Sequence, residues 1–332
     1  MAPRNTIFLH SGFRAGSTWF WHRFRAAAGT YAYYEPYHER LATLTADAAM
    51  IFGPQHWTSG HPALAAPYFS EYRPLLAPKG GLPLYQARFA AAAYYETGAD
   101  EDQAAYIRSL VDHAQRAGTV PVFGFCRSLA RVPWFRGLGY GVNIVTWRNP
   151  WDQWVSCRDQ AVLKQNWYFL FRYLLFASFG NRHPLYASFF AGLDLPPPPA
   201  GLADGQLEGI LGYFAAAAIR THFRVFLRVY MLDTLISLHH ADHAVDLDAL
   251  GDDADYRRRI TASLRDACSL DDLSFDDCAL PRHDKRDDAD YAACFDEAST
   301  LLEGVGAPLA GAHACAAPLL RRAMEDCRRR VG

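Results

Sequence analysis

Residues 6–19 read TIFLHSGFRAGSTW and combine three signals in succession. The run Thr6–His10 is short and apolar, which is typical of a buried strand. The next six residues include two glycines and predict a turn, and a helical pattern begins at Ser17. A strand that passes through such a turn directly into a helix presents unpaired backbone N–H groups and the positive end of the helix dipole to one point. The sequence therefore predicts an anion-binding turn over residues 11–18.

Similar apolar runs recur along the chain and alternate with helical patterns. We expect strands at 31–34, 120–125 and 142–147, and 243–247 is a weaker candidate for a fifth. The helical patterns cover residues 17–28, 102–116, 150–165, 209–238 and 287–302. Strands that alternate with helices are typical of a parallel sheet covered by helices on both faces. The predicted fold class is therefore α/β.

The chain has 332 residues, which is enough for one large domain or two ordinary ones. We find neither an internal repeat nor a linker, so we predict a single domain, 1–332, with two insertions. One, at about 52–83, is rich in Pro, Gly and aromatic residues. The other, at about 166–200, is rich in Phe and Tyr and includes four consecutive prolines at 196–199. We expect both insertions to form loops or lids over a site.

Composition excludes several classes of protein. Hydrophobic residues make up 51% of the chain and charged residues 20%, unlike disordered, collagen-like or coiled-coil sequences. The formal net charge of −2 gives no reason to expect a nucleic acid partner. The chain has neither a long apolar run nor a secretory signal, so we expect no membrane span and a cytoplasmic location. The seven cysteines form no C-x-x-C pair, so we expect neither a disulfide framework nor a metal site.

The side chains of the turn suit an oxyanion. Arg14 supplies a permanent positive charge, and the hydroxyls of Ser17 and Thr18 can donate to phosphate oxygens. The loop of nucleoside triphosphatases reads G-x-x-x-x-G-K-[ST], but here Gly12 stands only four residues before Gly16 and Ser17 occupies the lysine position. A nucleoside triphosphatase is therefore disfavoured. Taken alone, the segment would be explained more simply as a Ser/Thr-capped helix without a ligand.

Two segments together favour a ligand. Residues 13–19, FRAGSTW, resemble the P-K-S-G-T-T-W loop of the sulfotransferases that use 3′-phosphoadenosine 5′-phosphosulfate (PAPS). Residues 145–156, VTWRNPWDQWVS, resemble the second signature of that family, a strand ending in R-[ND]-P-x-D with a serine eight positions after the arginine. The resemblance implies a P-loop-NTPase-like sulfotransferase architecture, PAPS as donor, its desulfated form PAP as product, and a reaction without a metal.

The resemblance also implies roles for individual residues. In the family the first loop holds the 5′-phosphosulfate, and the tryptophan after it stacks on adenine. The corresponding residues here are Arg14, Ala15, Gly16, Ser17, Thr18 and Trp19. Arg148 and Ser156 correspond to the residues that hold the 3′-phosphate, and a strand end followed by a helix can bring them to one phosphate. The alternatives are an ion pair between Arg148 and Asp152, and a helix-surface position for Ser156.

The general base is predicted from a third segment. Many cytosolic sulfotransferases use the histidine of a K-T-H segment after the third strand, but no histidine stands between Val120 and Phe135. Glu35-Pro36 resembles instead the Glu-Pro motif of the carbohydrate and heparan sulfotransferases. We therefore expect Glu35 to be the base, with His38 as the second candidate, and Arg14 to be an electrostatic stabiliser. The alternative for Glu35 is a surface carboxylate or an ion pair with Arg14.

Other assignments stay open at this stage. Arg127 has two interpretations. It contacts either the sulfuryl group or an acidic acceptor, or it belongs to a structural ion pair. The cluster 281–286 is the only one that could close over the nucleotide, with Arg282 and Lys285 as its candidate residues, and a solvated turn is the alternative. The acceptor is a hydroxyl compound: an alcohol, such as a carbohydrate or a hydroxylated natural product. Competing functions are a small-molecule phosphotransferase with a P-loop and a nucleotide-binding module without catalysis.

Overall fold

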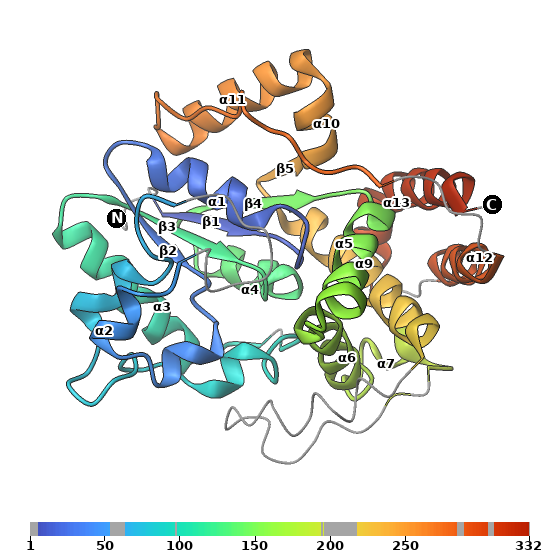
Figure 1. The fold of residues 1–332 in the computed structure, drawn as a ribbon, viewed down its shortest axis with the longest axis horizontal. Coiled ribbons are helices and arrows are strands. Elements are labelled where there is room, and N and C mark those ends of the chain that lie inside the picture. Colours follow the sequence, from blue (N-terminus) through green and yellow to red (C-terminus); the bar gives the residue numbers. More distant parts are fainter. Residues whose placement is uncertain are drawn as a thin grey trace.

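A computed structural model describes residues 6–53, 64–96, 98–193, 195, 218–283, 289–304 and 309–331. At its centre lies a five-stranded sheet in the order β2-β3-β1-β4-β5, and every neighbouring pair runs parallel (Figure 1). The strands are β1 Ile7–His10, β2 Thr30–Tyr34, β3 Val120–Phe125, β4 Val142–Trp147 and β5 His243–Asp246. The predicted α/β class with a parallel sheet is therefore confirmed, including the weaker fifth strand.

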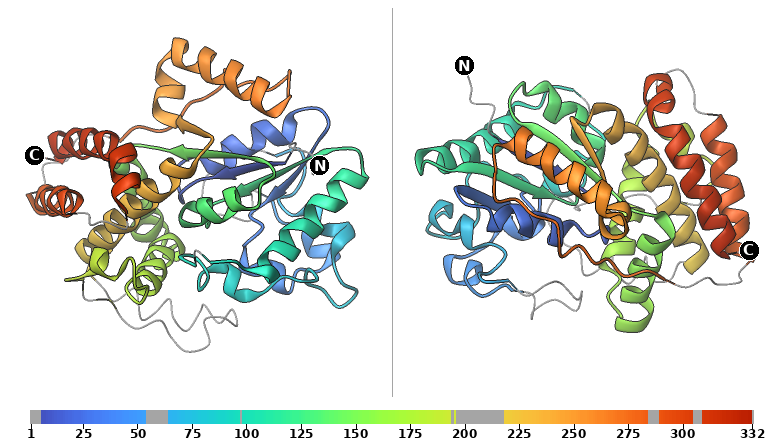
Figure 2. Two further views of the ribbon diagram at one scale, coloured as in Figure 1. Left: turned by 180° about the vertical axis from the view of Figure 1, so that it is seen from behind. Right: turned by 90° about the horizontal axis from the view of Figure 1, so that it is seen from above.

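Helices cover both faces of the sheet. Helices α1 and α11 pack on one face, and α3 and α4 pack on the other (Figures 1 and 2). This division follows from right-handed crossovers, because the chain moves in opposite directions from β1 to β2 and from β2 to β3. The α-helices are α1 Ser17–Ala26, α2 Ala46–Ala49, α3 Glu101–Arg116, α4 Val132–Gly137, α5 Pro150–Lys164, α6 Tyr168–Gly180, α7 Ala187–Phe190, α9 Ile219–His240, α10 Leu247–Asp252, α11 Ala254–Cys268, α12 Ala289–Glu303 and α13 Ala310–Val331. Short 3₁₀ turns span Glu39–Ala42, Ser70–Leu75, Ala87–Ala90 and Leu129–Arg131.

Strand β1 is the central strand of the sheet. All four of its residues are buried, and it pairs with β3 on one side and β4 on the other. After β1 and after β4 the chain turns toward opposite faces of the sheet. A crevice therefore forms outside the carboxyl ends of these two strands. Open parallel sheets bind their ligands at such a switch point.

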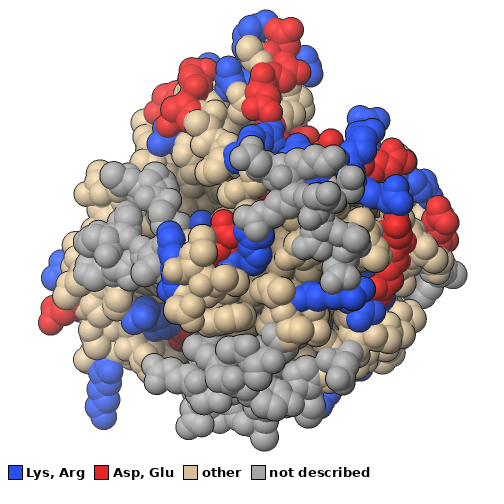
Figure 3. All heavy atoms as spheres, turned by 45° about the vertical axis from the view of Figure 1, so that its right-hand side comes forward, with Lys and Arg blue, Asp and Glu red and all other residues tan. Residues whose placement is uncertain are grey.

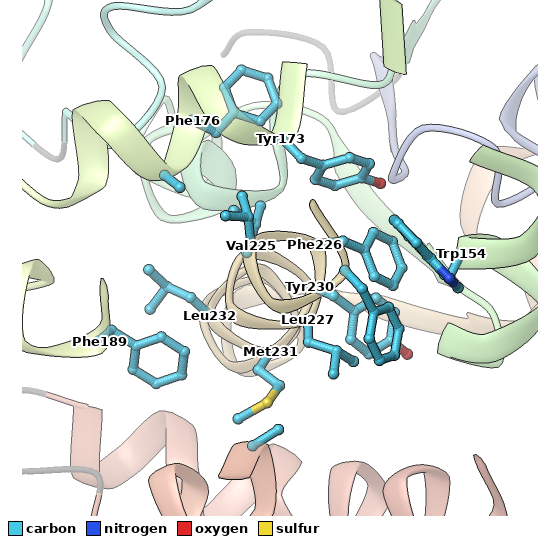
Figure 4. Close-up of a cluster of buried hydrophobic side chains, with 14 of the residues drawn as sticks. Trp154, Tyr173, Phe176, Phe189, Val225, Phe226, Leu227, Tyr230, Met231 and Leu232 are labelled. Carbon is cyan, nitrogen blue, oxygen red and sulfur yellow. The ribbon is translucent and has the colours of Figure 1, made fainter. Parts of the chain in front are cut away.

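A second hydrophobic core surrounds α9. Figure 4 looks along this helix and shows apolar side chains leaving it in several directions, toward α5, α6 and the C-terminal helices. A helix that is apolar on most of its faces must be buried. Two arginines of α9 are compensated locally, because Arg224 donates to Glu297 of α12 at 2.8 Å and Arg228 pairs with the same carboxylate.

The expectation of loops over residues 166–195 is wrong. This segment forms α6 and α7, and α6 buries residues on all of its sides, from Leu170 to Gly180. A helix without a polar face shows no period of 3.6 in its sequence, so the pattern did not indicate a helix. In the other insertion, Tyr68, Phe69 and Tyr72 are fully buried. The four prolines at 196–199 and Lys285 lie outside the described residues.

The surface carries mixed charge. On the face drawn in Figure 3, basic and acidic side chains of the described residues lie interspersed at the top and at the right. Within the described part of the chain, no helix combines the length and the apolar character needed to cross a bilayer.

Gly124 of β3 offers a test of the packing between the sheet and α1. A Cβ atom at this position would lie 2.5 Å from Cδ1 of the buried Trp21. We expect Gly124→Ala to lower the free energy of unfolding by about 1–3 kcal/mol, because the core would be overpacked. Gly137→Ala is the control, since nothing lies within 4 Å of its added Cβ, and its effect should stay below about 1 kcal/mol. Equal stabilities of the two variants in urea denaturation would contradict this packing.

Candidate functional site

The turn after β1 has the geometry of an anion-binding loop. The Ala15 N–H donates to the Gly12 carbonyl at 3.3 Å, and Arg14 and Gly16 adopt left-handed backbone angles with φ of 64° and 107°. Gly16 is the N-cap of α1, and no side chain caps the helix. The first backbone N–H groups of α1 therefore lack intrahelical partners and face the end of the sheet.

This geometry corrects two expectations. The interpretation of the segment as a Ser/Thr-capped helix is wrong, because a glycine without a side chain occupies the cap position. Ala15, which we assigned to nucleotide binding, is only 1% exposed and uses its N–H within the turn. It therefore shapes the loop. Gly16 has a second constraint, because an added Cβ would lie 3.0 Å from Leu280.

A pocket of about 470 Å³ lies at this carboxyl edge of the sheet. Its walls come from the segments that follow β1, β2, β3 and β4, from the start of α6 and from residues 279–281. Most residues that the sequence assigned to a site line this one pocket. They are Arg14, Gly16, Ser17, Thr18, Trp19, Glu35, His38, Arg148 and Ser156.

The two segments that resemble nucleotide-binding motifs meet in the pocket. The Arg14 Nε donates to the Ser156 Oγ at 3.0 Å, across 142 positions of sequence. The Arg14 guanidinium also lies 5.2 Å from the centre of the Phe169 ring. No carboxylate of the described residues pairs with Arg14, and burial lowers its pKa. Ser156 is thus a pocket residue and not the isolated helix-surface residue of the alternative interpretation.

Arg148 has a different partner from the one considered in the sequence. Its Nε lies 3.3 Å from Oδ1 of Asp248, which follows β5, and its guanidinium also donates to the Pro281 carbonyl. Asp152 is instead bonded to Arg330 at 3.1 Å and to the His283 N–H at 2.7 Å. The alternative considered from the sequence, an ion pair between Arg148 and Asp152, is therefore wrong.

Arg282 lies outside the pocket. Its guanidinium is 2.6 Å from Asp248 and 3.4 Å from Asp152, and it pairs with Asp252 as well. These three carboxylates hold the segment whose preceding residues, 279–281, line the pocket. The structure thus gives Arg282 a structural position and not the expected contact in the nucleotide pocket.

Glu35 is buried and belongs to an ion-pair network. It follows β2 directly, adopts a left-handed φ of 47°, and its N–H donates to the Gly124 carbonyl at 2.7 Å. Its carboxylate is 4% exposed and pairs with Arg127, so the alternatives of a surface carboxylate and of a partner for Arg14 are both wrong. Burial raises the pKa of the Glu35 carboxyl, and Arg127 opposes that rise.

Arg127 and a second glutamate complete the network. Arg127 is 1% exposed, donates to Glu39 at 3.1 Å and also contacts the Tyr168 hydroxyl. Arg172 lies 2.6 Å from the same Glu39 carboxylate. Burial acts to raise the pKa of Glu39, but the surrounding cations, led by Arg172, hold it well below its ordinary value. Two arginines therefore balance one buried and one partly buried carboxylate, and Arg127 is a member of the structural ion pair that the sequence left open.

His38 is poorly suited to accept a proton. Burial lowers the pKa of His38 to about 3, so the imidazole is neutral at physiological pH. Its Nδ1 accepts the Arg40 N–H at 3.1 Å, which places the ring proton on Nε2. A neutral histidine in this tautomer has no nitrogen lone pair left for an acceptor hydroxyl. Of the two candidate bases, Glu35 is favoured.

The pocket also contains residues that the sequence did not single out. The Cys126 Sγ lies 2.9 Å from the Ser17 Oγ, and the Tyr34 hydroxyl lies 3.1 Å from the Thr18 Oγ1. Both residues stand at strand ends, so the rule that ligands gather at the carboxyl edge could have found them. Phe169 stands in α6, where we expected a loop, and no sequence signal pointed to it.

Comparisons with known proteins add nothing to this geometry: no family model, no curated protein and no solved structure matches the chain. The site is defined by its own residues: a loop that opens into an uncapped helix, two further arginines and a buried carboxylate in one pocket of an α/β fold.

Removal of Arg127 tests the network. We expect Arg127→Met to lower the free energy of unfolding by about 3–5 kcal/mol at pH 8, because it leaves the buried Glu35 carboxylate without a counter-charge, while Glu39 keeps Arg172. The pKa of Glu35 would then lie above that of a glutamate in the unfolded chain, so the loss should shrink as the pH falls to 5 and protonates Glu35. Urea denaturation at both pH values measures this.

The control is Arg88→Met, whose guanidinium is 28% exposed and pairs with Asp100 at 2.7 Å. A partly exposed pair of this kind should cost less than about 1 kcal/mol. A loss in Arg127→Met that is small, or that grows at low pH, would show that the network is not the stabilising element described.

Proposed function

We propose that this protein transfers a sulfuryl group from PAPS to a hydroxyl acceptor. The observation that chiefly supports the proposal is the state of Arg14. It is a partly buried cation that no carboxylate of the described residues neutralises, it stands at the start of an uncapped helix, and it is bonded to Ser156 of the second motif. Such an arrangement is stabilised by a bound anion.

The pocket residues fit a nucleotide with an anionic group at each end. The N–H groups at the start of α1 and the side chains of the loop would hold the 5′-phosphosulfate. Arg148 and Ser156 would hold the 3′-phosphate, and the Trp19 ring, which lines the pocket, would stack on adenine. The donor supplies an activated sulfuryl group when it is bound. The loop side chains that would hold the 5′-phosphosulfate are Arg14, Ser17 and Thr18.

The catalytic roles follow from charge and protonation. Glu35 would take the proton of the acceptor hydroxyl, since burial raises its pKa toward the range in which a carboxylate is an effective base. Arg127 would orient that carboxylate through the ion pair. Arg14 would stabilise negative charge on the leaving phosphate, because a guanidinium stays protonated and cannot act as an acid.

The competing functions have less support. A phosphotransferase of the P-loop type uses a loop lysine, but Ser17 stands in that position and the cations lining the described pocket are arginines. A binding module without catalysis would use Glu35 only in its ion pair with Arg127. A buried carboxylate held in a left-handed backbone conformation is costly, and such strain is typical of functional sites.

Nucleotide binding can be tested by thermal unfolding. We expect PAP without Mg²⁺ to raise the melting temperature by about 5 °C or more at 100 times its Kd, and adenosine 5′-phosphate, which lacks the 3′-phosphate, to bind more weakly. Ser156→Ala should weaken PAP binding about tenfold, because it removes a hydroxyl from the pocket. Ser109→Ala, in α3 and outside the pocket, is the control. Stabilisation by ATP only with Mg²⁺ would favour the phosphotransferase.

The role of Glu35 can be separated from binding. We expect Glu35→Gln to lower kcat at least 100-fold with an unchanged PAP affinity, because the amide cannot accept the proton. In the wild type, kcat/KM should fall as the pH drops below the raised pKa of Glu35, and this acid limb should vanish in the variant. Glu71→Gln is the control, a buried acid that pairs with Arg25 at 2.7 Å outside the pocket. An active Glu35→Gln enzyme with the wild-type pH profile would exclude Glu35 as the base.

A further inference from the structure

Aromatic rings and Glu35 line one part of the pocket, which we call the acceptor end, because Arg127, the partner of Glu35, lies 5.2 Å from the centre of the Phe13 ring and 5.9 Å from that of Tyr168. Phe13, Tyr168 and Phe169 form a contiguous group, with ring centres 5.9 Å apart for Phe13 and Phe169 and 5.5 Å apart for Tyr168 and Phe169. The His38 ring stacks on Tyr168 at 6.5 Å. All of these residues line the same pocket as Glu35. The acceptor end therefore offers ring faces and edges to a compound held against the base.

The polar groups at the acceptor end are already engaged within the protein. The Tyr168 hydroxyl contacts Arg127 and lies 3.0 Å from Glu39. The Asn166 side chain accepts the Tyr168 N–H at 3.3 Å. The Tyr34 hydroxyl pairs with Thr18 at 3.1 Å.

The charged and imidazole groups are engaged as well. Arg127 is neutralised by Glu35 and Glu39, and the His38 Nδ1 accepts the Arg40 N–H at 3.1 Å. Among these groups, Glu35 is the one to which the proposed reaction assigns the acceptor hydroxyl. A ligand that carried further hydroxyls into this end would have to break one of these bonds or leave its own hydroxyls unpaired.

From this arrangement we infer that the acceptor presents one hydroxyl on an otherwise apolar ring, as a phenol or a cyclic alcohol does, and is not a carbohydrate. The inference rests on the proposed function and specifies its substrate class. Apolar ring faces contact the aromatic side chains without needing polar partners, whereas each unpaired hydroxyl of a sugar loses its hydration on entering. A site in which most polar groups are already bonded within the protein therefore discriminates against polyols.

A matched pair of ring compounds tests the inference. Both 4-methylcyclohexanol and methyl β-xylopyranoside are saturated six-membered rings, but the sugar carries two additional hydroxyls. We expect the PAP-saturated protein to bind 4-methylcyclohexanol about 100-fold more tightly in calorimetry, about tenfold for each unpaired hydroxyl, and kcat/KM with PAPS to follow the same order. Equal or tighter binding of the xyloside would overturn the inference.

The two readouts separate the substrate class from the reaction. Sulfation of the xyloside in preference to the cyclohexanol would refute the substrate class and support sulfuryl transfer. The predicted order of binding without any sulfated product would support the acceptor class of the pocket and contradict the proposed function. Failure of 4-methylcyclohexanol to bind would contradict the inference whatever the turnover.

A pair of substitutions on one helix locates the acceptor. Phe169→Leu removes a ring from the acceptor end, and we expect it to raise KM for 4-methylcyclohexanol about tenfold with little change in kcat. Phe179→Leu is the matched control, since Phe179 lies on the same helix α6 and packs against the second core outside the pocket. Equal effects of the two substitutions on KM would place the acceptor elsewhere.

Discussion

Parallel pairing of β1 with β3 on one side and β4 on the other is the constraint from which the site follows. Because all strands run the same way, their carboxyl ends meet at one edge, and the segments after them converge although they lie far apart in sequence. Arg14, Glu35, Arg127 and Arg148 each stand within four residues of such an end. A change in strand order would separate them even if every local conformation stayed the same.

Charge balance within the pocket gives its two ends different chemistry. At the acceptor end, Arg127 and Arg172 are offset by Glu35 and Glu39, so these cations hold the buried Glu35 carboxylate and its neighbour in place. At the loop, Arg14 has no such counterpart among the described residues. An anion is therefore favoured at the loop and a neutral compound at the other end, which is the separation that transfer from a charged donor to a hydroxyl requires.

Sequence reasoning succeeded where a signal is local. The strands were predicted because short apolar runs bounded by Gly or Pro are distinctive, and the loop because a strand, a glycine turn and a helix follow each other directly. It failed for α6, whose mostly apolar sequence carries no helical period, and that failure hid Phe169 and Tyr168. Helix identity there is decided by tertiary burial and not by local pattern.

The sequence also failed to predict which charged residues pair with one another, because ion pairs depend on distances through space. Asp152 is the nearest acid to Arg148 in sequence, but β5 brings Asp248 beside Arg148, and α13 brings Arg330 to Asp152. Arg127 was recognised as a strand-end cation, yet only the pairing of β2 with β3 shows that it meets Glu35. Single-sequence analysis can thus name the residues at the edge of the sheet without assigning their bonds.

The most direct measurement is a crystal structure of the protein with PAP. The account predicts density for the 5′-phosphate at the start of α1 beside Arg14, and for the 3′-phosphate between Arg148 and Ser156. Density for both phosphates away from these residues, or an empty pocket in crystals grown at saturating PAP, would contradict it.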